Sequence, residues 1–330
     1  MNPRALQRNV PFLATVVVCL LLYLAASASY TGFASLRVLV NFFADNSFLG
    51  VAALGLTFVI LSGGIDLSVG GVIGLVSIVL ALALEKWRLP AAVAIPCVLL
   101  GGGVLGATMG ALIQFFMLPP FLVTLGGMFF ARGLAYLISL ESLPITGGLD
   151  VINNKVHLPI GETVDVPATA IAFLVVFAAA FVLAHFTRFG RNVYAIGGNE
   201  QSALLMGLPV TRTKIGVYAL SGSFSAGAGV IYCLYTQSGN PNAGTGLELD
   251  AIAAVVIGGT LLSGGVGYVA GTMVGVLIFG IIQTAIVFQG TLSSWWTKIV
   301  IGILLLAFIL LQKMIQAKKF RTAKTFQMAK

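Results

Sequence analysis

Charged side chains are scarce in this sequence. Of its 330 residues, 8% are Asp, Glu, Lys or Arg and 58% are hydrophobic, and the mean hydropathy is +1.04. An ordinary soluble domain carries about 25% charged residues, so the composition excludes that class. The formal net charge is +8, but the basic residues gather in short segments between apolar runs. That pattern indicates membrane topology, and nucleic acid is not an expected partner.

Sequence motifs for catalysis are also missing. The chain has no Gly-x-x-x-x-Gly-Lys-Ser/Thr phosphate loop, so we do not expect it to hydrolyse ATP itself. It has neither His-Glu-x-x-His nor Gly-x-Ser-x-Gly. Its three cysteines lie in apolar runs without metal or disulfide spacing, and its two histidines have no ligand partner nearby in sequence. We therefore expect no enzyme active site, no metal site and no cofactor.

Long apolar runs are what the sequence has instead. A spanning helix needs about 20 apolar residues, and strands of a membrane barrel would alternate polar with apolar residues, which these runs do not. The sequence therefore predicts an all-α polytopic protein in contact with membrane lipid, a single membrane domain over residues 1–330 with about ten transmembrane helices. The predicted spans are 11–28, 46–62, 71–84, 91–116, 121–140, 168–186, 215–236, 251–264, 268–288 and 295–312.

The basic residues give the orientation, because short cytoplasmic loops are rich in Lys and Arg. We expect both termini in the cytoplasm, with 313–330 as a basic cytoplasmic tail and 141–167 as a periplasmic loop. The run 251–264 is short for a full crossing, but the basic tail would lie outside if it did not cross. Arg4 and Arg8 before an apolar run ending at Ala26-Ser27-Ala28 fit a cleavable signal peptide as well as an uncleaved first span.

One interior stretch, residues 187–214, is polar between two apolar runs. Within it the sequence predicts a short helix: Asn199 is a good N-cap, Glu200 suits the positive end of the helix dipole, and Gly207 and Pro209 end it. A membrane protein that exposes one short capped helix to the aqueous side is expected to use it as a contact for another protein. The expected contact residues are Asn199, Glu200, Gln201, Ser202, Ala203 and Gly207.

A weak internal repeat links two glycine-rich stretches, near residues 50–75 and 251–276. Ser62-Gly63-Gly64 in the first corresponds to Ser263-Gly264-Gly265 in the second. Transporters are often built from such repeats, whose glycine-broken helices meet near the substrate path. Chance coincidence in a chain with 40 glycines is the alternative, and the orientation of the halves stays open.

The first of these stretches holds an acid between two apolar helices. Its members Gly63, Gly64, Asp66, Ser68 and Gly70 are expected to cap or gate the helices that they interrupt. Asp66 is an N-cap for the following helix in one interpretation. In the other, it is an intramembrane acid that couples movement to transport. Glu248 and Asp250 are expected to cap the helix that follows them.

A set of uncharged polar and aromatic residues suits a solute path. Amides can bind sugar hydroxyls, and aromatic faces can cover the C–H face of a sugar. The candidates are Gln114, Thr124, Tyr232, Tyr235, Asn240, Asn242 and Gln283. Taken alone, each of them is better explained as an interhelical hydrogen bond or an interfacial anchor. Trp295-Trp296 and Tyr30 are typical of an aromatic belt at the membrane interface.

Three motifs in order resemble the permease subunits of bacterial ABC importers for monosaccharides, the ribose, xylose and galactose group. They are LSGGIDLSVG (61–70), FGRNVYAIGGNEQSALLMGLPVTRTK (189–214) and ELDAIAAVVIGGTLLSGG (248–265). The runs GMFFARG (127–133) and QGTLSSWWTKI (289–299) are most similar to a permease of a galactofuranose importer. The resemblance covers about residues 46–312.

The resemblance implies an inner-membrane pore subunit that imports a neutral monosaccharide by alternating access. Its implied partners are ABC ATPase subunits, a periplasmic sugar-binding protein and a second permease, which is either the same chain or a different one. The family's docking motif, Glu-Ala-Ala-x-x-x-Gly, is degenerate here: Gln201-Ser202-Ala203 and Gly207 occupy its frame, and the acid is displaced to Glu200. Together with the capped helix, the resemblance implies that this segment is the contact for the ATPase subunit. The alternatives are an ion-coupled secondary sugar transporter that uses Asp66 and a membrane scaffold without transport activity.

Overall fold

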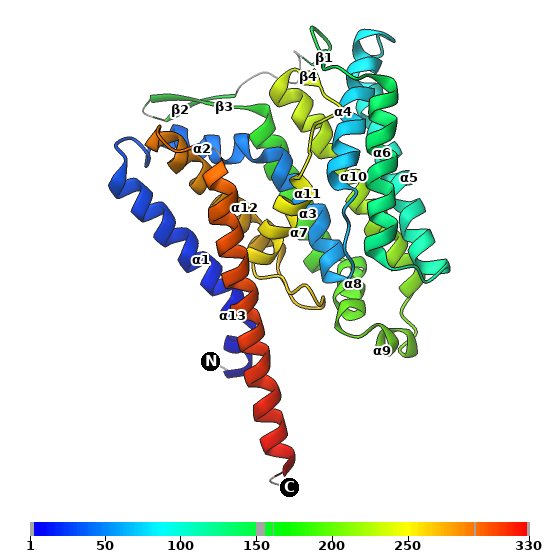
Figure 1. The fold of residues 1–330 in the computed structure, drawn as a ribbon, viewed down its shortest axis with the longest axis vertical. Helices are drawn as coiled ribbons and strands as arrows, with labels where there is room; N and C mark the ends of the chain where they lie inside the picture. Colours follow the sequence, from blue (N-terminus) through cyan, green and yellow to red (C-terminus); the bar gives the residue numbers. More distant parts are fainter. Residues whose placement is uncertain (1–2, 150–155, 161, 294, 329–330) are drawn as a thin grey trace.

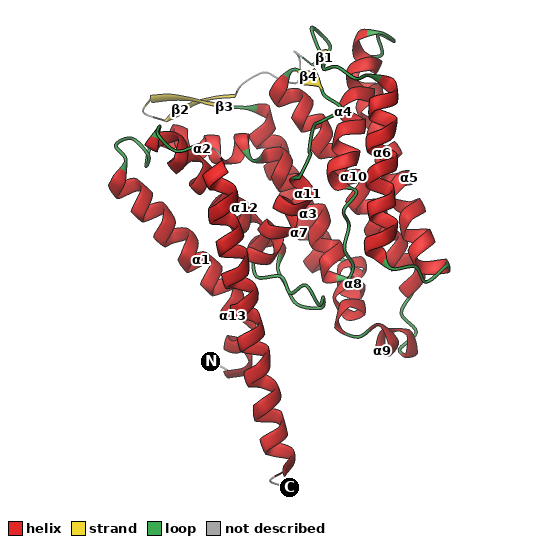
Figure 2. Cartoon of the chain, viewed as in Figure 1, coloured by secondary structure: helices red, strands yellow, loops and turns green. Residues whose placement is uncertain are grey.

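Helices make up most of the chain in the computed structural model, which describes residues 3–149, 156–160, 162–293 and 295–328 (Figure 2). The helices are α1 (Pro3–Ser29), α2 (Leu36–Asp45), α3 (Ser47–Leu61), α4 (Val69–Glu85), α5 (Ala91–Phe115), α6 (Pro120–Ile138), α7 (Ala168–Phe186), α8 (Arg188–Gly198), α9 (Glu200–Leu205), α10 (Val210–Thr236), α11 (Leu247–Ile257), α12 (Val269–Gln289) and α13 (Trp295–Met328).

Two small antiparallel sheets depart from the all-α prediction. β1 (Leu143–Pro144) pairs with β4 (Ser238–Gly239), and β2 (Val156–Ile160) pairs with β3 (Glu162–Val166). Three of these strands lie in the stretch 141–167 that was predicted as a loop. A polar segment of this length satisfies its backbone groups by pairing with itself and with the end of α10, and its Gly and Pro residues gave no periodic signal for strands.

Seven of the described helices are long and apolar enough to cross a membrane: α1 from Phe12, α5, α6, α7, α10, α12 and α13 up to Met314. α2 and α3 together pass the same test but are bent by 56°, which makes up to eight. α4 has 17 residues, and α11 has 11, a length of about 16 Å. Neither α4 nor α11 spans by length alone, so the structure supports seven or eight of the ten predicted spans.

α11 also begins and ends earlier than predicted. It begins at Leu247 after Gly246 and ends at Ile257, not at residue 264. Glu248 and Asp250 thus lie inside its first turn, so the prediction that they cap it is wrong; there they still favour the helix dipole. Gly259, with a φ of +91°, lies in the left-handed region and stops the helix.

Direct backbone contact between α5 and α10 forms one side of the bundle. A Cβ atom at Gly106 would overlap the Tyr218 carbonyl oxygen, and one at Gly102 would lie 2.5 Å from the Gly222 oxygen. Glycines four residues apart on α5 thus let the two helices approach closely, as small residues do in membrane bundles. α3 lies deeper: all of its residues except Phe48 are buried.

Two helix–break–helix units form the centre of the protein. α3 and α4 are separated by residues 62–68, and α11 and α12 by residues 258–268. Gly63 and Gly264 occupy corresponding places in the two breaks, and their φ values are +83° and +82°. The predicted internal repeat thus corresponds to two segments of the same form.

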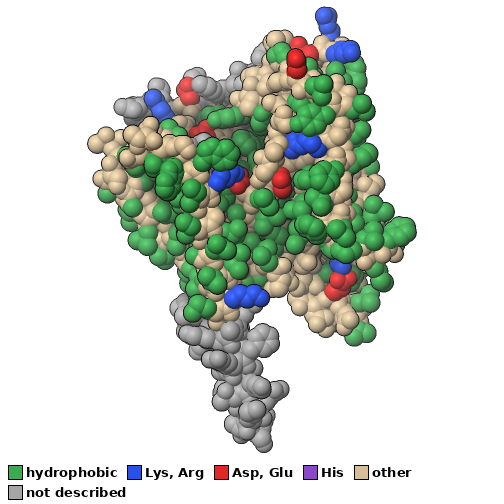
Figure 3. Space-filling model, in the orientation of Figure 1, with side chains coloured by type: hydrophobic (Ala, Val, Ile, Leu, Met, Phe, Trp, Pro, Cys, Tyr) green, Lys and Arg blue, Asp and Glu red, His purple; other side chains and the backbone are tan. Residues whose placement is uncertain are grey.

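Different secondary-structure elements lie at the two ends of the molecule. α8, α9, the beginning of α1 and the end of α13 lie at one end, and the four strands lie at the other (Figure 1). Between them the visible surface is mostly hydrophobic, with few Lys, Arg, Asp or Glu side chains (Figure 3). A hydrophobic belt between two polar ends is the surface that a bilayer requires.

Candidate coupling segment and helix breaks

The short helix α9 forms where the sequence predicted it. The Asn199 side chain accepts a hydrogen bond of 2.8 Å from the Ser202 backbone N–H, which caps the helix. Gly207 has a φ of +76°, and the next backbone N–H, of Leu208, donates back to the Ala203 carbonyl at 3.1 Å. Ala203 itself is buried against α8 and α10. The predicted cap and stop of α9 are therefore confirmed.

The outward face of α9 is apolar, which the sequence reasoning missed. Leu204, Leu205 and Met206, here called the α9 tip, are 64%, 88% and 69% exposed. Gln201 and Ser202 are exposed beside them. Glu200, by contrast, forms an ion pair with Lys214 at 2.6 Å, so much of its charge is compensated within the chain. The signal was present in the sequence: three large apolar residues follow one another in a segment that is otherwise polar.

The end of α8 is in direct backbone contact with the end of α3 and with the second break. A Cβ atom at Gly197 would overlap the Leu61 carbonyl oxygen at the end of α3 and lie 2.6 Å from the Gly265 nitrogen in the second break. The Gly265 N–H in turn donates to the Leu61 oxygen at 2.9 Å. A Cβ at Gly265 would lie 2.7 Å from the Gly198 Cα. The end of α8, the end of α3 and the second break therefore meet where glycine alone fits.

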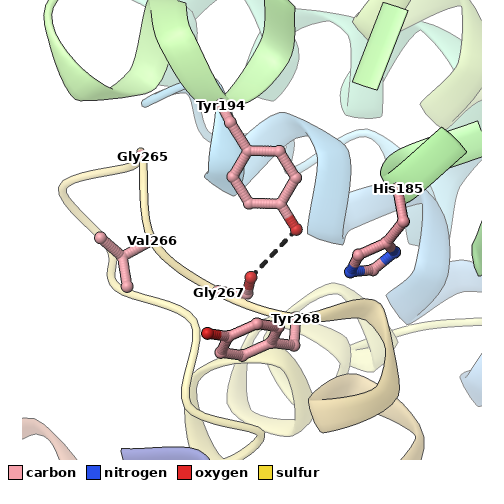
Figure 4. Close-up of a pocket in the computed structure, with 6 residues that line it drawn as sticks. All are labelled: His185, Tyr194, Gly265, Val266, Gly267 and Tyr268. Atoms are coloured by element: carbon pink, nitrogen blue, oxygen red, sulfur yellow. Dashed lines mark hydrogen bonds between the residues drawn. The ribbon is translucent and has the colours of Figure 1, made fainter. Parts of the chain in front are cut away.

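A side-chain contact ties α8 to the second break as well. The Tyr194 hydroxyl donates to the Gly267 carbonyl at 3.0 Å, and both residues line a cavity of about 310 Å³ with His185 and Tyr268 (Figure 4). Burial, with a smaller contribution from Tyr268, raises the pKa of Tyr194 to about 12, so this hydroxyl keeps its proton and remains a donor at neutral pH. His185 stacks on Phe181, with ring centroids 4.5 Å apart.

Asp66 lies in the first break and is fully buried. Its Oδ1 accepts hydrogen bonds from the Ser68 backbone N–H at 2.8 Å and from the Ser68 hydroxyl at 2.6 Å. Its Oδ2 accepts from the Ser221 hydroxyl of α10 at 2.7 Å. The residue that immediately precedes α4 is Ser68, not Asp66. Asp66 still satisfies a free backbone N–H at the beginning of that helix, and it also joins the break to α10.

The glycines of the first break have separate roles. Gly63 has a φ of +83°, in the left-handed region that glycine adopts without strain. Gly64 faces Tyr218, whose ring carbon Cζ would lie 3.3 Å from a Cβ there. Gly70, in the first turn of α4, packs against the carbonyl of Gly244, which a Cβ would overlap.

Thr124, one of the predicted path residues, lies on α6. Its side chain is buried and donates a 2.9 Å hydrogen bond to the Pro120 oxygen within its own helix.

The C-terminal end of α10 and the loop after it hold four of the predicted path residues. Tyr232 packs edge-on against Phe48, with ring centroids 5.9 Å apart, and the Tyr235 hydroxyl donates to Asp45 at 3.2 Å. In the loop, the Asn242 N–H donates to the Asn240 side chain at 2.8 Å.

An arginine that the sequence reasoning did not select holds this loop. Arg132 of α6 donates to the carbonyl oxygens of Pro241 and of Ala243, the latter at 2.8 Å. It also donates to the Gly70 oxygen in the first turn of α4 at 3.0 Å. Arg132 thus fixes the loop with Asn240 and Asn242 against α4.

The predicted path residues therefore do not all gather at one place. Gln114 lies at the end of α5, 3.5 Å from the Thr211 hydroxyl at the beginning of α10. Gln283 lies on α12 in a cavity with Asp250 and Lys298. Polarity in a sequence does not say which side of a bundle a residue faces, so a single set mixed residues from both ends.

Comparison with known proteins gives a consistent set of relatives. The family model "Branched-chain amino acid transport system / permease component" matches residues 38–309. The chain is 51% identical to the inner membrane ABC transporter permease protein YjfF of Escherichia coli over 93% of each chain. It is 39% identical to the fructose import permease protein FruG of Bifidobacterium longum, over 94% of this chain and 93% of the relative. It is 40% identical to the ribose import permease protein RbsC of Bacillus subtilis, over 80% and 81%. No solved structure matches it.

We expect Asp66→Asn to keep most of the thermal stability and Asp66→Leu to lose it. An amide oxygen can still accept from the Ser68 N–H and hydroxyl, whereas leucine leaves buried donors without acceptors, at a cost of about 1–3 kcal/mol each. Ser221→Ala, which removes one of the three bonds, should fall between. The measurement is the unfolding midpoint of the purified protein in detergent. An equal loss in the Asn and Leu variants would mean that the negative charge is what the site requires.

Proposed function

Because the chain belongs to the permease family of ABC importers described as the branched-chain amino acid transport system / permease component, we propose that it forms half of a pore that imports a neutral monosaccharide. The protein is a multi-pass protein of the inner membrane and is not itself an enzyme. Family membership implies partner ATPase subunits, which supply the energy, and a substrate-binding protein, which delivers the solute.

The choice of a sugar over an amino acid rests on the relatives. The family description mentions branched-chain amino acids, but two of the relatives are named as import permeases for fructose and ribose. An amino acid also carries two charges, which a site would have to neutralise, whereas a sugar needs hydrogen bonds and apolar faces. Within the sugars we propose galactofuranose or a galactose-like solute, on the resemblance of residues 127–133 and 289–299 noted above.

The observation that carries the proposal is the α8–α9 segment. We propose that the α9 tip, with Asn199, Gln201 and Ser202 beside it, is the contact for the ATPase subunit. Exposed apolar side chains at the aqueous end of a membrane protein are typical of a protein interface. Glu200 acts in this account through its ion pair with Lys214, which holds α9 against the beginning of α10.

The topology that fits this contact has α9 and both termini in the cytoplasm. The chain then passes ten times between the two sides, along α1, α3 to α7 and α10 to α13. α4 and α11 are too short to span the membrane by themselves, and α3 and α4, like α11 and α12, meet at a break within the protein. Such breaks are tolerated at membrane depth when they are buried in protein, as Gly64, Asp66 and Gly70 are.

A second permease subunit, identical or different, would complete the pore. Arg132 and the Asp250–Lys298 pair are partly exposed on otherwise apolar helices. Ionisable side chains at such positions face a bundle interior or a water-filled cavity rather than lipid. The surface that carries them is therefore proposed to face the partner permease across the solute path.

The ion-coupled alternative is not favoured. Both oxygens of Asp66 already accept hydrogen bonds from Ser68 and Ser221, and the relatives belong to ABC importers. Asp66 has a sufficient structural role in holding the first break to α10.

The test is uptake by the assembled transporter in proteoliposomes. With loaded binding protein outside and ATP enclosed, radiolabelled galactose or galactofuranose should enter, and a protonophore should leave the rate unchanged. Unlabelled ribose and fructose should compete to different extents, and leucine should not. Uptake driven by a proton gradient without ATP, or transport of leucine in place of sugar, would contradict the proposal.

Gly197→Ala should abolish coupling, whereas Gly198→Ala should not. Both substitutions add one methyl group in the last turn of α8, with the same change in helix propensity. At 197 that methyl would overlap the Leu61 oxygen, and at 198 it would meet nothing within 4 Å. We expect sugar uptake to fall at least about tenfold in Gly197→Ala, with the ATPase still bound, because a core overlap of this kind forces a backbone shift. Equal activity of the two variants would show that this contact does not transmit movement.

A further inference from the structure

A cavity of about 380 Å³ lies between α11, α12 and α13. Asp250 of α11, Gln283 of α12, and Trp295, Thr297 and Lys298 of α13 line it, together with aliphatic side chains of α12 and α13. The beginning of α13 lies at the end of the molecule opposite α9 (Figure 1). In the proposed topology the cavity is therefore near the periplasmic side, where solute enters.

The polar groups of this cavity retain bonding capacity. The Lys298 ammonium donates to Asp250 Oδ2, which leaves the other carboxylate oxygen and the remaining ammonium hydrogens for a ligand. The side chains of Lys298 and Asp250 are 53% and 23% exposed. Gln283 is exposed, and its amide makes no hydrogen bond within the described chain. The cavity thus presents acceptors and donors side by side from three helices.

The charges select a neutral ligand. Asp250 and Lys298 compensate each other, so an anion would meet the carboxylate and a cation would meet the ammonium. A hydroxyl group both donates and accepts, and can therefore bond to either member of the pair. A ligand with several hydroxyls on a compact ring satisfies the pair and the Gln283 amide together.

Trp295 provides the apolar surface that a sugar site needs beside its polar groups. Trp295 is 75% exposed at the cavity wall, so the indole face is free to cover the C–H face of a sugar ring. The cavity volume falls in the range of small-molecule sites, about 300–1,000 Å³, and is large enough for one monosaccharide.

We propose that Asp250, Gln283, Trp295 and Lys298 form a monosaccharide subsite at the outer mouth of the permease. The proposal rests on the proposed function and adds to it a place where sugar released from the binding protein first contacts this chain. It also assigns Trp295 a role different from that of its neighbour. Trp296 is 47% exposed but does not line the cavity, so Trp296 keeps the interfacial anchoring role.

Trp295 lines the cavity and its neighbour Trp296 does not, so the same substitution at Trp296 is a matched control. In the complete transporter reconstituted with saturating loaded binding protein, the readouts are radiolabelled galactose imported and ATP hydrolysed. We expect Trp295→Leu and Gln283→Leu to lower the galactose imported per ATP by about two- to tenfold, the range for loss of one aromatic contact or of one hydrogen bond. Trp296→Leu should leave the ratio unchanged.

Three outcomes would overturn the subsite. The first is an unchanged ratio in both Trp295→Leu and Gln283→Leu. The second is an equal fall in the two tryptophan variants, which would assign both to interfacial anchoring. The third is a fall in the amount of folded complex with an unchanged ratio, which would make the residues structural. If the wild-type transporter imports no sugar at all, the proposed function fails, and the subsite fails with it.

Discussion

Close backbone contact without intervening side chains is the constraint on which this structure depends. At the end of α8, Gly197 touches the last carbonyl of α3, and that carbonyl accepts the N–H of Gly265 in the second break at 2.9 Å. Side chains at such a junction could change rotamer and absorb a displacement, but backbone atoms in contact cannot. A shift of α9 is therefore passed to both broken helix units at once, and this is how we propose that an ATPase cycle opens and closes the pore.

The remaining polar contacts place the two breaks relative to the bundle. Asp66 bonds to Ser221, so the first break is held to α10, whose first turns belong to the same polar segment, residues 187–214, as α9. Tyr194 bonds to Gly267, so the second break is held to α8. At the far end, Arg132 binds the loop after α10 to α4. The α8–α9 segment and the loop after α10 are thus connected through α10, which has 27 residues, and through α4, which lies in the upper part of the protein (Figure 1).

Local features could be predicted from the sequence, and long-range ones could not. Asn199 and Gly207 predicted α9 because caps and stops act within one helix. The glycines at 63–64 and 264–265 predicted the breaks for the same reason. The sequence did not predict that Gly197 joins the two breaks, nor that Asp250 pairs with Lys298 and meets Gln283, because those contacts depend on how helices distant in sequence pack. The exposure of the α9 tip could have been predicted, because its three apolar residues lie together in a polar segment. It was not predicted, because apolar residues are common throughout this sequence and these three became distinct only in the structure.

The most direct test of the account is whether the ATPase subunit binds at the α9 tip. The measurement is co-purification of the ATPase with the permease after Leu205→Asp. The control is Trp87→Asp, which adds the same charge at an exposed apolar residue just after the C-terminal end of α4. The account predicts that Leu205→Asp is inserted at normal level but loses the ATPase, because the new carboxylate must be desolvated in the interface. It predicts that Trp87→Asp retains the ATPase. Normal co-purification and normal sugar uptake with Leu205→Asp would contradict it.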